Sequence, residues 1–244
     1  MNKIATTCLL GLAALLLAAS LALAAGTDLT IRPNLVTIGT SFNGAQLTVT
    51  GHVPEGDSAV IRLMGEPQHR TFRQKGKALG VLWMNLKTVE LRGVPDVFLM
   101  GTDGVAQVNW EHSDLGFQSI KGDADDLIFD EFIKLMERDG FYEVENGVVA
   151  YEPADNGERP FKATLAIPSA MHQGVYRVEV LAVKDGRVAD VAARELHTRL
   201  TGLPEFLSAF AFDHSLLYGV AAVIIAILAG LAMSLIFKER GGVH

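Results

Sequence analysis

Cysteine is almost absent from this sequence, since Cys8 is the only one in 244 residues. A single thiol cannot form an internal disulfide, and it cannot supply a cysteine-based zinc site. Cys8 also comes before the main apolar run near the N-terminus, so it does not match the cysteine of a lipoprotein signal. The chain is therefore expected to fold without disulfides, and no thiol catalysis is expected.

Basic residues are also scarce. The sequence has 21 Lys and Arg against 28 Asp and Glu, a net charge of −7, which argues against a nucleic-acid partner. Charged residues make up only 20% and hydrophobic residues 49%, a balance that excludes a disordered chain. The mean hydropathy of +0.26 is high for a soluble domain and indicates that part of the chain lies in a membrane.

Recognisable catalytic motifs are missing as well. The sequence has no H-E-x-x-H pair, no G-x-S-x-G elbow and no glycine-rich phosphate loop followed by lysine. We therefore predict no catalytic residues, no metal site and no cofactor, and we expect a protein that is not an enzyme. The alternative is an envelope hydrolase with a site assembled across loops, for which Glu111, His112, Asp114 and His172 are the candidates.

The first 24 residues have the layout of a secretory signal peptide. Lys3 is the early charge, an apolar run extends from Leu9 to Leu17, and Ala22-Leu23-Ala24 has the A-x-A form of a cleavage site. The alternative is an uncleaved membrane anchor. The small residues at the end of the run favour export and cleavage.

A second apolar segment, residues 216–237, contains no charged side chain. At 1.5 Å per residue it spans about 33 Å, enough to cross the core of a bilayer. Lys238 and Arg240 follow it, so the positive-inside rule predicts that the tail, residues 238–244, is cytoplasmic. The bulk of the chain is then expected in the periplasm, held in the bacterial inner membrane by a single pass.

Small residues recur every four positions along this span, at Ala222, Ala226, Gly230 and Ser234. This spacing lets two membrane helices approach closely. The face is a candidate contact with a second copy of the chain or with a polytopic membrane protein such as a transporter. The alternative is that alanine and glycine are simply common in membrane helices.

A short amphipathic helix is predicted just before the span, over residues 203–215. Pro204 suits the first turn of a helix. Apolar side chains at helical spacing follow on one side, at Leu203, Phe206, Leu207 and Phe210. We expect this helix to form a collar on the membrane surface.

Residues 25–202 are dominated by period-two alternation, which is typical of half-buried strands. Ala45, Leu47 and Val49 show it most clearly. Short strands with frequent turn signals favour a mainly β fold, an immunoglobulin-like β-sandwich without the usual disulfide. Helical spacing after Asp125 interrupts this pattern and predicts a helical insertion at about residues 111–140.

Strand boundaries follow from the turn residues. Residues 29–38 are expected to form the first strand. Asp185-Gly186 predicts a hairpin turn between two alternating segments. Thr71–Gln74 and Leu79–Met84 flank Lys75-Gly76-Lys77, which is expected to form the turn of another hairpin.

Charge is distributed unevenly along this region. Residues 62–92 carry seven basic and two acidic side chains, whereas residues 111–158 carry fourteen acidic and three basic ones. The basic hairpin is a candidate site for an anion, a lipid headgroup or an acidic partner, through Arg70, Arg73, Lys75 and Lys77. Two alternatives are an edge hairpin whose charges prevent aggregation, and pairing with the acidic insertion of the same molecule.

Several segments together resemble a known family. They are Phe42-Asn43-Gly44-Ala45, Arg73-Gln74-Lys75 with Gly80–Asn85, Phe161–Leu165 with Gly174–Val180, and Leu216-Leu217-Tyr218-Gly219. In this order they resemble the putative transmembrane protein family of alphaproteobacterial type. The resemblance implies an exported protein with one C-terminal span and no catalytic residue. It also implies an accessory role beside an exporter of sulfite or organosulfonates, because members are often encoded near such exporters.

The leading hypothesis is a membrane-anchored periplasmic binding or accessory module that is not an enzyme. Its span would pack against a polytopic membrane protein, and its loops or basic hairpin would contact that partner. The envelope hydrolase is one alternative. A structural protein of the envelope, which would need neither a pocket nor a charged patch, is the other.

Overall fold

Alternating apolar side chains form strands along the central part of this chain, and the computed structural model is mainly β, as the sequence predicts. It describes residues 27–78, 81–104 and 113–238. The predicted signal peptide and nearly all of the predicted cytoplasmic tail lie outside the described residues, as do the first two residues of the predicted insertion.

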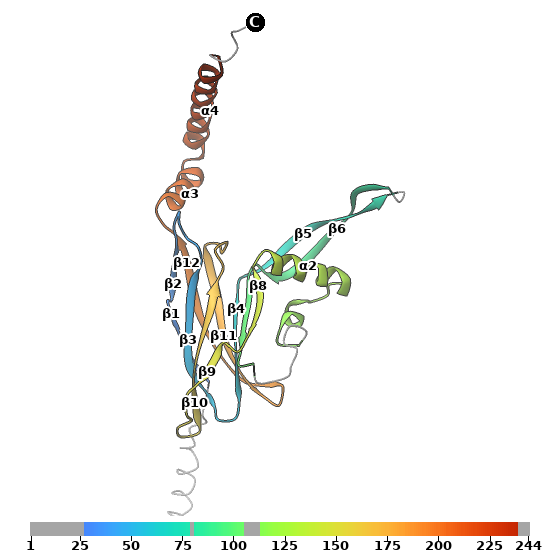
Figure 1. Ribbon diagram of the computed structural model, residues 1–244, viewed down its shortest axis with the longest axis vertical. Coiled ribbons are helices and arrows are strands. Elements are labelled where there is room, and N and C mark those ends of the chain that lie inside the picture. Colours follow the sequence, from blue (N-terminus) through green and yellow to red (C-terminus); the bar gives the residue numbers. More distant parts are fainter. Residues whose placement is uncertain (1–26, 79–80, 105–112, 239–244) are drawn as a thin grey trace, which may run out of the picture.

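Two sheets face each other to form a β-sandwich (Figure 1). The smaller sheet has the strand order β1 (Asp28–Arg32), β3 (Ala45–Pro54), β10 (Glu158–Ile167) and β9 (Val149–Tyr151). The larger sheet has the order β2 (Leu35–Ile38), β12 (Arg187–Leu200), β11 (Gly174–Lys184), β4 (Ser58–Met64), β7 (Phe98–Thr102) and β8 (Tyr142–Asn146). Neighbouring strands are antiparallel except β2–β12 and β7–β8, which are parallel.

The first hydrophobic core lies between these sheets. Leu47 and Val49 of β3 are fully buried in it, as their alternation predicts, and they pack with side chains of the larger sheet such as Ile61 and Val178. The finer immunoglobulin-like assignment stays a prediction.

The expected first strand is wrong in one respect. Residues 29–38 form two strands, β1 and β2, which belong to different sheets. Pro33 lies between them and has no amide hydrogen to donate to a ladder, so β1 ends before it. The chain therefore crosses from one sheet to the other at a position that alternation alone does not reveal.

The basic hairpin is longer than expected. β5 (Pro67–Ala78) and β6 (Leu82–Pro95) form a two-stranded ribbon that is separate from both sheets. The predicted turn at Lys75-Gly76-Lys77 is wrong, because these residues pair with Asn85, Met84 and Trp83 within the ribbon. The turn falls after Ala78, and a register shift between Gln74 and Lys75 inserts an extra residue in β6.

The predicted insertion is helical and lies between β7 and β8. It contains a short 3₁₀ turn, η2 (Phe117–Ile120), and helix α2 (Asp126–Arg138). The carboxylate of Asp125 accepts hydrogen bonds from the first-turn amides of α2, and Gly140, with a φ of 75°, follows its last turn. The buried side of α2 covers the outer face of the larger sheet and forms a second core there.

Two helices complete the described chain. α3 (Leu203–Asp213) occupies the predicted juxtamembrane segment, and α4 (Ser215–Lys238) continues from it along the long axis of the molecule (Figure 1). The rings of Phe210 and Tyr218 lie 6.0 Å apart and join the two helices. Residues 215–235 of α4 are long and apolar enough to cross a membrane, and none of them is buried inside the protein.

Candidate functional site

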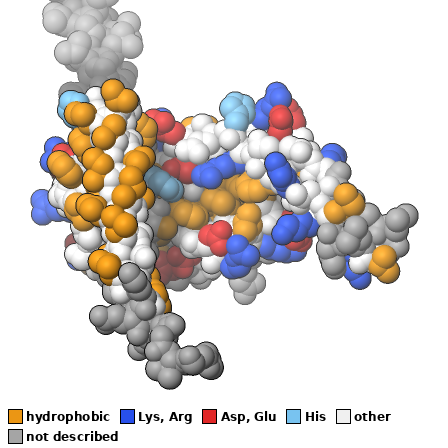
Figure 2. Space-filling view, turned by 90° about the horizontal axis from the view of Figure 1, so that it is seen from above, with side chains coloured by type: hydrophobic (Ala, Val, Ile, Leu, Met, Phe, Trp, Pro, Cys, Tyr) orange, Lys and Arg blue, Asp and Glu red, His pale blue; other side chains and the backbone are white. Residues whose placement is uncertain are grey.

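The most conspicuous surface feature is an arm formed by the β5–β6 ribbon and helix α2. Figure 1 shows the ribbon leaving the sandwich sideways, with α2 beside its inner half. Seen from the α4 end (Figure 2), the arm carries hydrophobic side chains that are flanked by Lys and Arg. The arm therefore combines the two surface properties that most often mark a binding site, exposed apolar area and concentrated charge.

The inner half of the ribbon is fixed to the sandwich by aromatic packing. The ring of Phe132 on α2 lies 5.6 Å from the ring of Phe72 on β5 and 5.6 Å from that of Tyr142 on β8. Val89 and Leu91 of β6 are buried on the same side. Because one helix contacts both the ribbon and the larger sheet, the root of the arm has a defined position.

Tyr142 lies at the centre of this packing. Its side chain is 1% exposed, and its hydroxyl donates a 2.7 Å hydrogen bond to the carbonyl of Pro95. Burial raises the pKa of the Tyr142 phenol, and the charge of nearby Arg70 partly opposes this rise. The buried, hydrogen-bonded tyrosine is therefore part of the packing at the root of the arm.

A groove runs between α2 and the ribbon. Leu127, Ile128 and Leu135 of α2 line one side, and Phe72 lies on the other. The groove has a volume of about 420 Å³, and the side chain of Leu127 is 77% exposed beside it. Arg73, Lys75 and Glu131 supply its polar lining. An apolar floor with a few charged groups is the usual character of a site for a peptide segment or small amphipathic molecule.

The four predicted patch residues do not form one surface. Arg70 is half-buried at the root of the arm beside Tyr142, and its Nε atom is buried. Arg73, Lys75 and Lys77 lie farther along the ribbon and are exposed. The structure therefore separates a structural arginine from three outer cations, of which Arg73 and Lys75 line the groove.

Pairing with the acidic insertion was one expectation for these cations. Within the described part of the chain, no ion pair joins Arg70, Arg73 or Lys75 to the insertion. The insertion's carboxylates pair locally instead, as in Lys121–Asp126, Lys134–Glu131 and Arg138–Asp139. Arg73 and Lys75 thus contribute positive charge to the surface of the ribbon.

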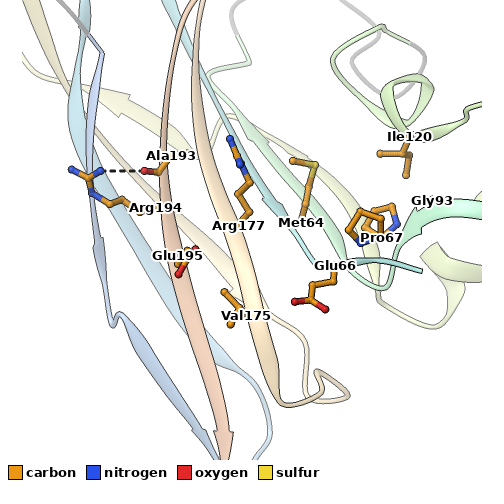
Figure 3. A pocket seen from close by; sticks show the side chains of 12 residues that line it. Met64, Glu66, Pro67, Gly93, Ile120, Val175, Arg177, Ala193, Arg194 and Glu195 are labelled. Carbon is orange, nitrogen blue, oxygen red and sulfur yellow. Dashed lines mark hydrogen bonds between the residues drawn. The ribbon is translucent and has the colours of Figure 1, made fainter. Parts of the chain in front are cut away.

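A second hollow, of about 440 Å³, lies where β4 passes into β5 (Figure 3). Arg177 on β11 and Glu195 on β12 line it, with Glu66 opposite. The guanidinium of Arg177 donates a 2.6 Å hydrogen bond to Glu179, so its charge is already partly neutralised. Charges of both signs therefore surround this hollow, and its Arg177 is already engaged within the larger sheet.

The candidates for a hydrolase site can be placed only in part. Glu111 and His112 lie outside the described residues. Asp114 is exposed, and His172 stacks its ring on Phe141 at a centroid distance of 6.3 Å. Among the described residues, no group of three His, Cys, Asp or Glu side chains could hold a metal ion.

The small-residue face of α4 is fully accessible. Ala222, Ala226, Gly230 and Ser234 are all exposed, and a methyl group added at Gly230 would meet no atom within 4 Å. Nothing in the described chain covers this face, so it remains a predicted helix-packing surface.

Sequence reasoning missed the groove. Its apolar residues come from two segments that are more than 30 positions apart, near Phe72 and near Leu127. The available signal was the helix periodicity, because Leu127 and Leu135 fall away from the buried face that holds Phe129 and Met136. That signal shows a wide apolar surface on the helix but does not identify its neighbour.

Comparison with known proteins supports the membrane character of the chain. A family model described as a putative transmembrane protein (Alph_Pro_TM) matches residues 28–239. No curated protein matches the chain. The family match extends from β1 through the arm to the end of α4, so it covers every element discussed above.

Proposed function

The chain belongs to this putative transmembrane protein family, and we propose that it is a non-enzymatic, membrane-anchored binding module that assists a polytopic membrane protein. In this proposal α4 crosses the bacterial inner membrane. The sandwich and the arm lie in the periplasm, residues 1–24 direct export, and the tail after α4 is cytoplasmic. The excess of basic residues after the span supports this orientation.

The groove of the arm is the observation that carries this proposal. Leu127 is 77% exposed at its edge, although the same helix buries four other apolar side chains. Leaving a leucine in water instead of burying it forgoes about 2 kcal/mol of stabilisation. A binding partner that covers Leu127 recovers this contribution, which is the physical basis for assigning the groove to partner binding.

The proposed occupant is a periplasmic segment of a polytopic membrane protein. Arg73 and Lys75 at the groove favour a segment that is acidic as well as apolar. α4 restricts the arm to the vicinity of the membrane, where such segments emerge. The exposed small-residue face of α4 gives the same partner a second contact, inside the bilayer.

An anion exporter is the proposed class of partner. The resemblance to proteins encoded beside sulfite and organosulfonate exporters supports this choice. A deletion strain is then expected to become sensitive to sulfite or sulfonates, and expression of the full chain is expected to restore resistance. Unchanged tolerance of these anions in the deletion strain would contradict the exporter assignment but not the binding role itself.

Site-specific photocrosslinking in intact cells tests the groove. A photoreactive amino acid at position 127 is expected to form an adduct with a polytopic membrane protein, which mass spectrometry would identify. Position 188 is the matched control, because Val188 is 41% exposed but lies on β12 away from the arm. Adducts at 127 and not at 188 support the proposal.

A substitution complements the crosslinking. Leu127→Asp is expected to reduce co-purification of the crosslinked protein in mild detergent at least about ten-fold, because a buried leucine contributes about 2 kcal/mol. Val188→Asp is expected to leave it unchanged. Equal losses for both variants, or adducts at 127 that contain only a second copy of this chain, would contradict the proposal.

A further inference from the structure

The outer end of the ribbon has a composition of its own. We define the ribbon tip as Lys77, Val81, Met84 and Lys87. All four side chains are exposed, Val81 at 83% and Met84 at 47%. The tip projects beyond α2, and neither Val81 nor Met84 belongs to either hydrophobic core, so core packing does not account for these exposed apolar side chains.

The charge of this region is entirely of one sign. Residues 73–88 include four basic residues and no acidic one, in a chain whose net charge is −7. An apolar centre flanked by lysines is the composition of segments that lie in the headgroup region of a bilayer. Apolar side chains enter the boundary of the acyl chains, while the long lysine side chains keep their charges among the phosphates.

The position of the tip fits the same chemistry. In Figure 1 the ribbon rises from the sandwich until its tip reaches the height of α3, the helix from which α4 begins. Figure 2, seen from the α4 end, shows the arm extending sideways from the hydrophobic column of α3 and α4. The tip therefore lies beside the membrane-proximal end of the molecule rather than at its far end.

We propose that the ribbon tip docks onto the anionic headgroups of the same bilayer that α4 crosses. The protein then contacts the membrane at two separated places, α4 and the tip. Two contacts restrict rotation of the sandwich about α4, which a single helix does not. The groove between α2 and the ribbon would consequently be held at a fixed height above the lipid surface.

The charge composition favours a lipid surface over a protein as the occupant of the tip. Each lysine near an anionic surface contributes about 1 kcal/mol, which is about a five-fold change in the docking equilibrium. Such attraction needs no matched positions of opposite charge, so it suits a flat array of phosphates. This inference concerns the tip and does not depend on the occupant of the groove.

The sequence supplies a reporter for docking. Trp83 and Trp110 are the two tryptophans, and the backbone of Trp83 pairs with Lys77 in the ribbon. In a Trp110→Phe background, the full chain is reconstituted into vesicles of brominated phosphatidylcholine with or without phosphatidylglycerol. Docking is expected to bring Trp83 into contact with brominated acyl chains, which quench its fluorescence, and phosphatidylglycerol is expected to increase the quenching.

A matched reporter controls for the membrane anchor that all variants share. Trp83→Phe/Trp110→Phe/Val188→Trp places the fluorophore next to the β11–β12 turn, which lies at the end of the sandwich away from α4 (Figure 1). This reporter is expected to show no quenching in either kind of vesicle. The comparison uses purified protein and lipid only, so its outcome is independent of any protein partner.

Substitutions then test the chemistry. Lys77→Gln and Lys87→Gln are each expected to lower the ratio of docked to undocked tips about five-fold in vesicles with phosphatidylglycerol, and high salt is expected to act in the same direction. Lys162→Gln and Lys184→Gln, at exposed positions of the sandwich, are expected to leave the ratio unchanged. Val81→Asp is expected to reduce quenching in both kinds of vesicle.

Two results would overturn the inference. One is quenching of Trp83 no greater than that of the reporter at position 188. The other is quenching that does not respond to phosphatidylglycerol or to the two tip lysines. Correct folding of each variant is checked by circular dichroism, so that loss of quenching reports docking and not unfolding.

Discussion

One carboxylate in the larger sheet accepts hydrogen bonds from two arginines, and the two should differ greatly in their contribution to stability. Oε2 of Glu179 lies 2.6 Å from Nη2 of Arg62, and Oε1 lies 2.6 Å from Nε of Arg177. The side chain of Glu179 is 9% exposed, that of Arg62 15% and that of Arg177 63%. The two distances are thus matched and both arginines bind the same carboxylate, but the two cations differ in burial.

Burial determines the magnitude that we expect. Removing one member of a buried ion pair costs about 3–5 kcal/mol, because the remaining charge is left desolvated without a counter-charge. Arg62→Met also removes the 3.2 Å hydrogen bond from Nη1 to the carbonyl of Leu115. Since Arg177 still compensates Glu179, we expect the lower end of this range, about 3 kcal/mol. Arg177→Met, an exposed pair, should cost less than about 1 kcal/mol.

The double variant provides the sharper test. In Arg62→Met the exposed Arg177 is the remaining cation on Glu179, so removing it as well leaves that carboxylate without a charged partner. The cost of Arg62→Met/Arg177→Met should therefore exceed the sum of the two single costs by about 1–2 kcal/mol. Replacing Glu179 by Gln in the double variant should recover part of the loss, because the uncompensated charge is then absent.

Urea unfolding of the full chain in detergent, followed by circular dichroism of the strands, measures these differences. Variants are compared where the slope of the unfolding free energy against urea concentration is the same. A change in the midpoint of unfolding then reports a change in stability. Equal costs for Arg62→Met and Arg177→Met would refute the reasoning, because burial would then not determine the contribution of the pair. Strict additivity in the double variant would refute the shared role of Glu179.

Three further changes have expected outcomes that the same unfolding assay checks. Gly51→Ala should cost about 1–3 kcal/mol, because a Cβ there would lie 2.1 Å from the backbone oxygen of Asp28 in the neighbouring strand. Asp125→Ala should cost about 1 kcal/mol by removing the N-terminal cap of α2, whereas Asp125→Asn should cost much less. Burial raises the pKa of Tyr151 to about 12 from 10.0, so its phenol ionises more easily in the unfolded chain and stability should decline between pH 10 and 12. Burial also raises the pKa values of Tyr142 and Tyr176, so Tyr151→Phe should make that decline shallower without abolishing it.

Local periodicity predicted those elements whose stability depends on one buried face. Leu47 and Val49 alternate and are buried as expected, and α4 was recognisable from its uninterrupted apolar run. The hairpin turn was misplaced because Lys75-Gly76-Lys77 has the composition of a turn. The ribbon nevertheless continues through these residues. A β-bulge accommodates the extra residue of β6, and strand pairing resumes beyond it.

The candidate site was harder to predict, because it depends on contacts between distant segments. The basic residues of the ribbon were recognisable, but their division into one half-buried arginine and three outer cations requires knowing where α2 lies. Phe72 and Phe132 meet across a separation of 60 positions, and neither segment alone specifies that contact. Alternation and helical spacing describe one element at a time, whereas a groove is a property of two.

The insertion also explains why β11 departs from simple alternation. Residues 178–183 are buried without interruption, because Val178 and Val180 face the first core while Leu181 and Val183 face the second. A sheet covered on both faces leaves no solvent side for a charged residue. Glu179 is the charged residue within that run, and it requires the cation of Arg62 on β4 beside it. Covering the outer face with α2 thus fixes the arm in place and, by the same packing, buries Glu179 so that its charge depends on Arg62 for compensation.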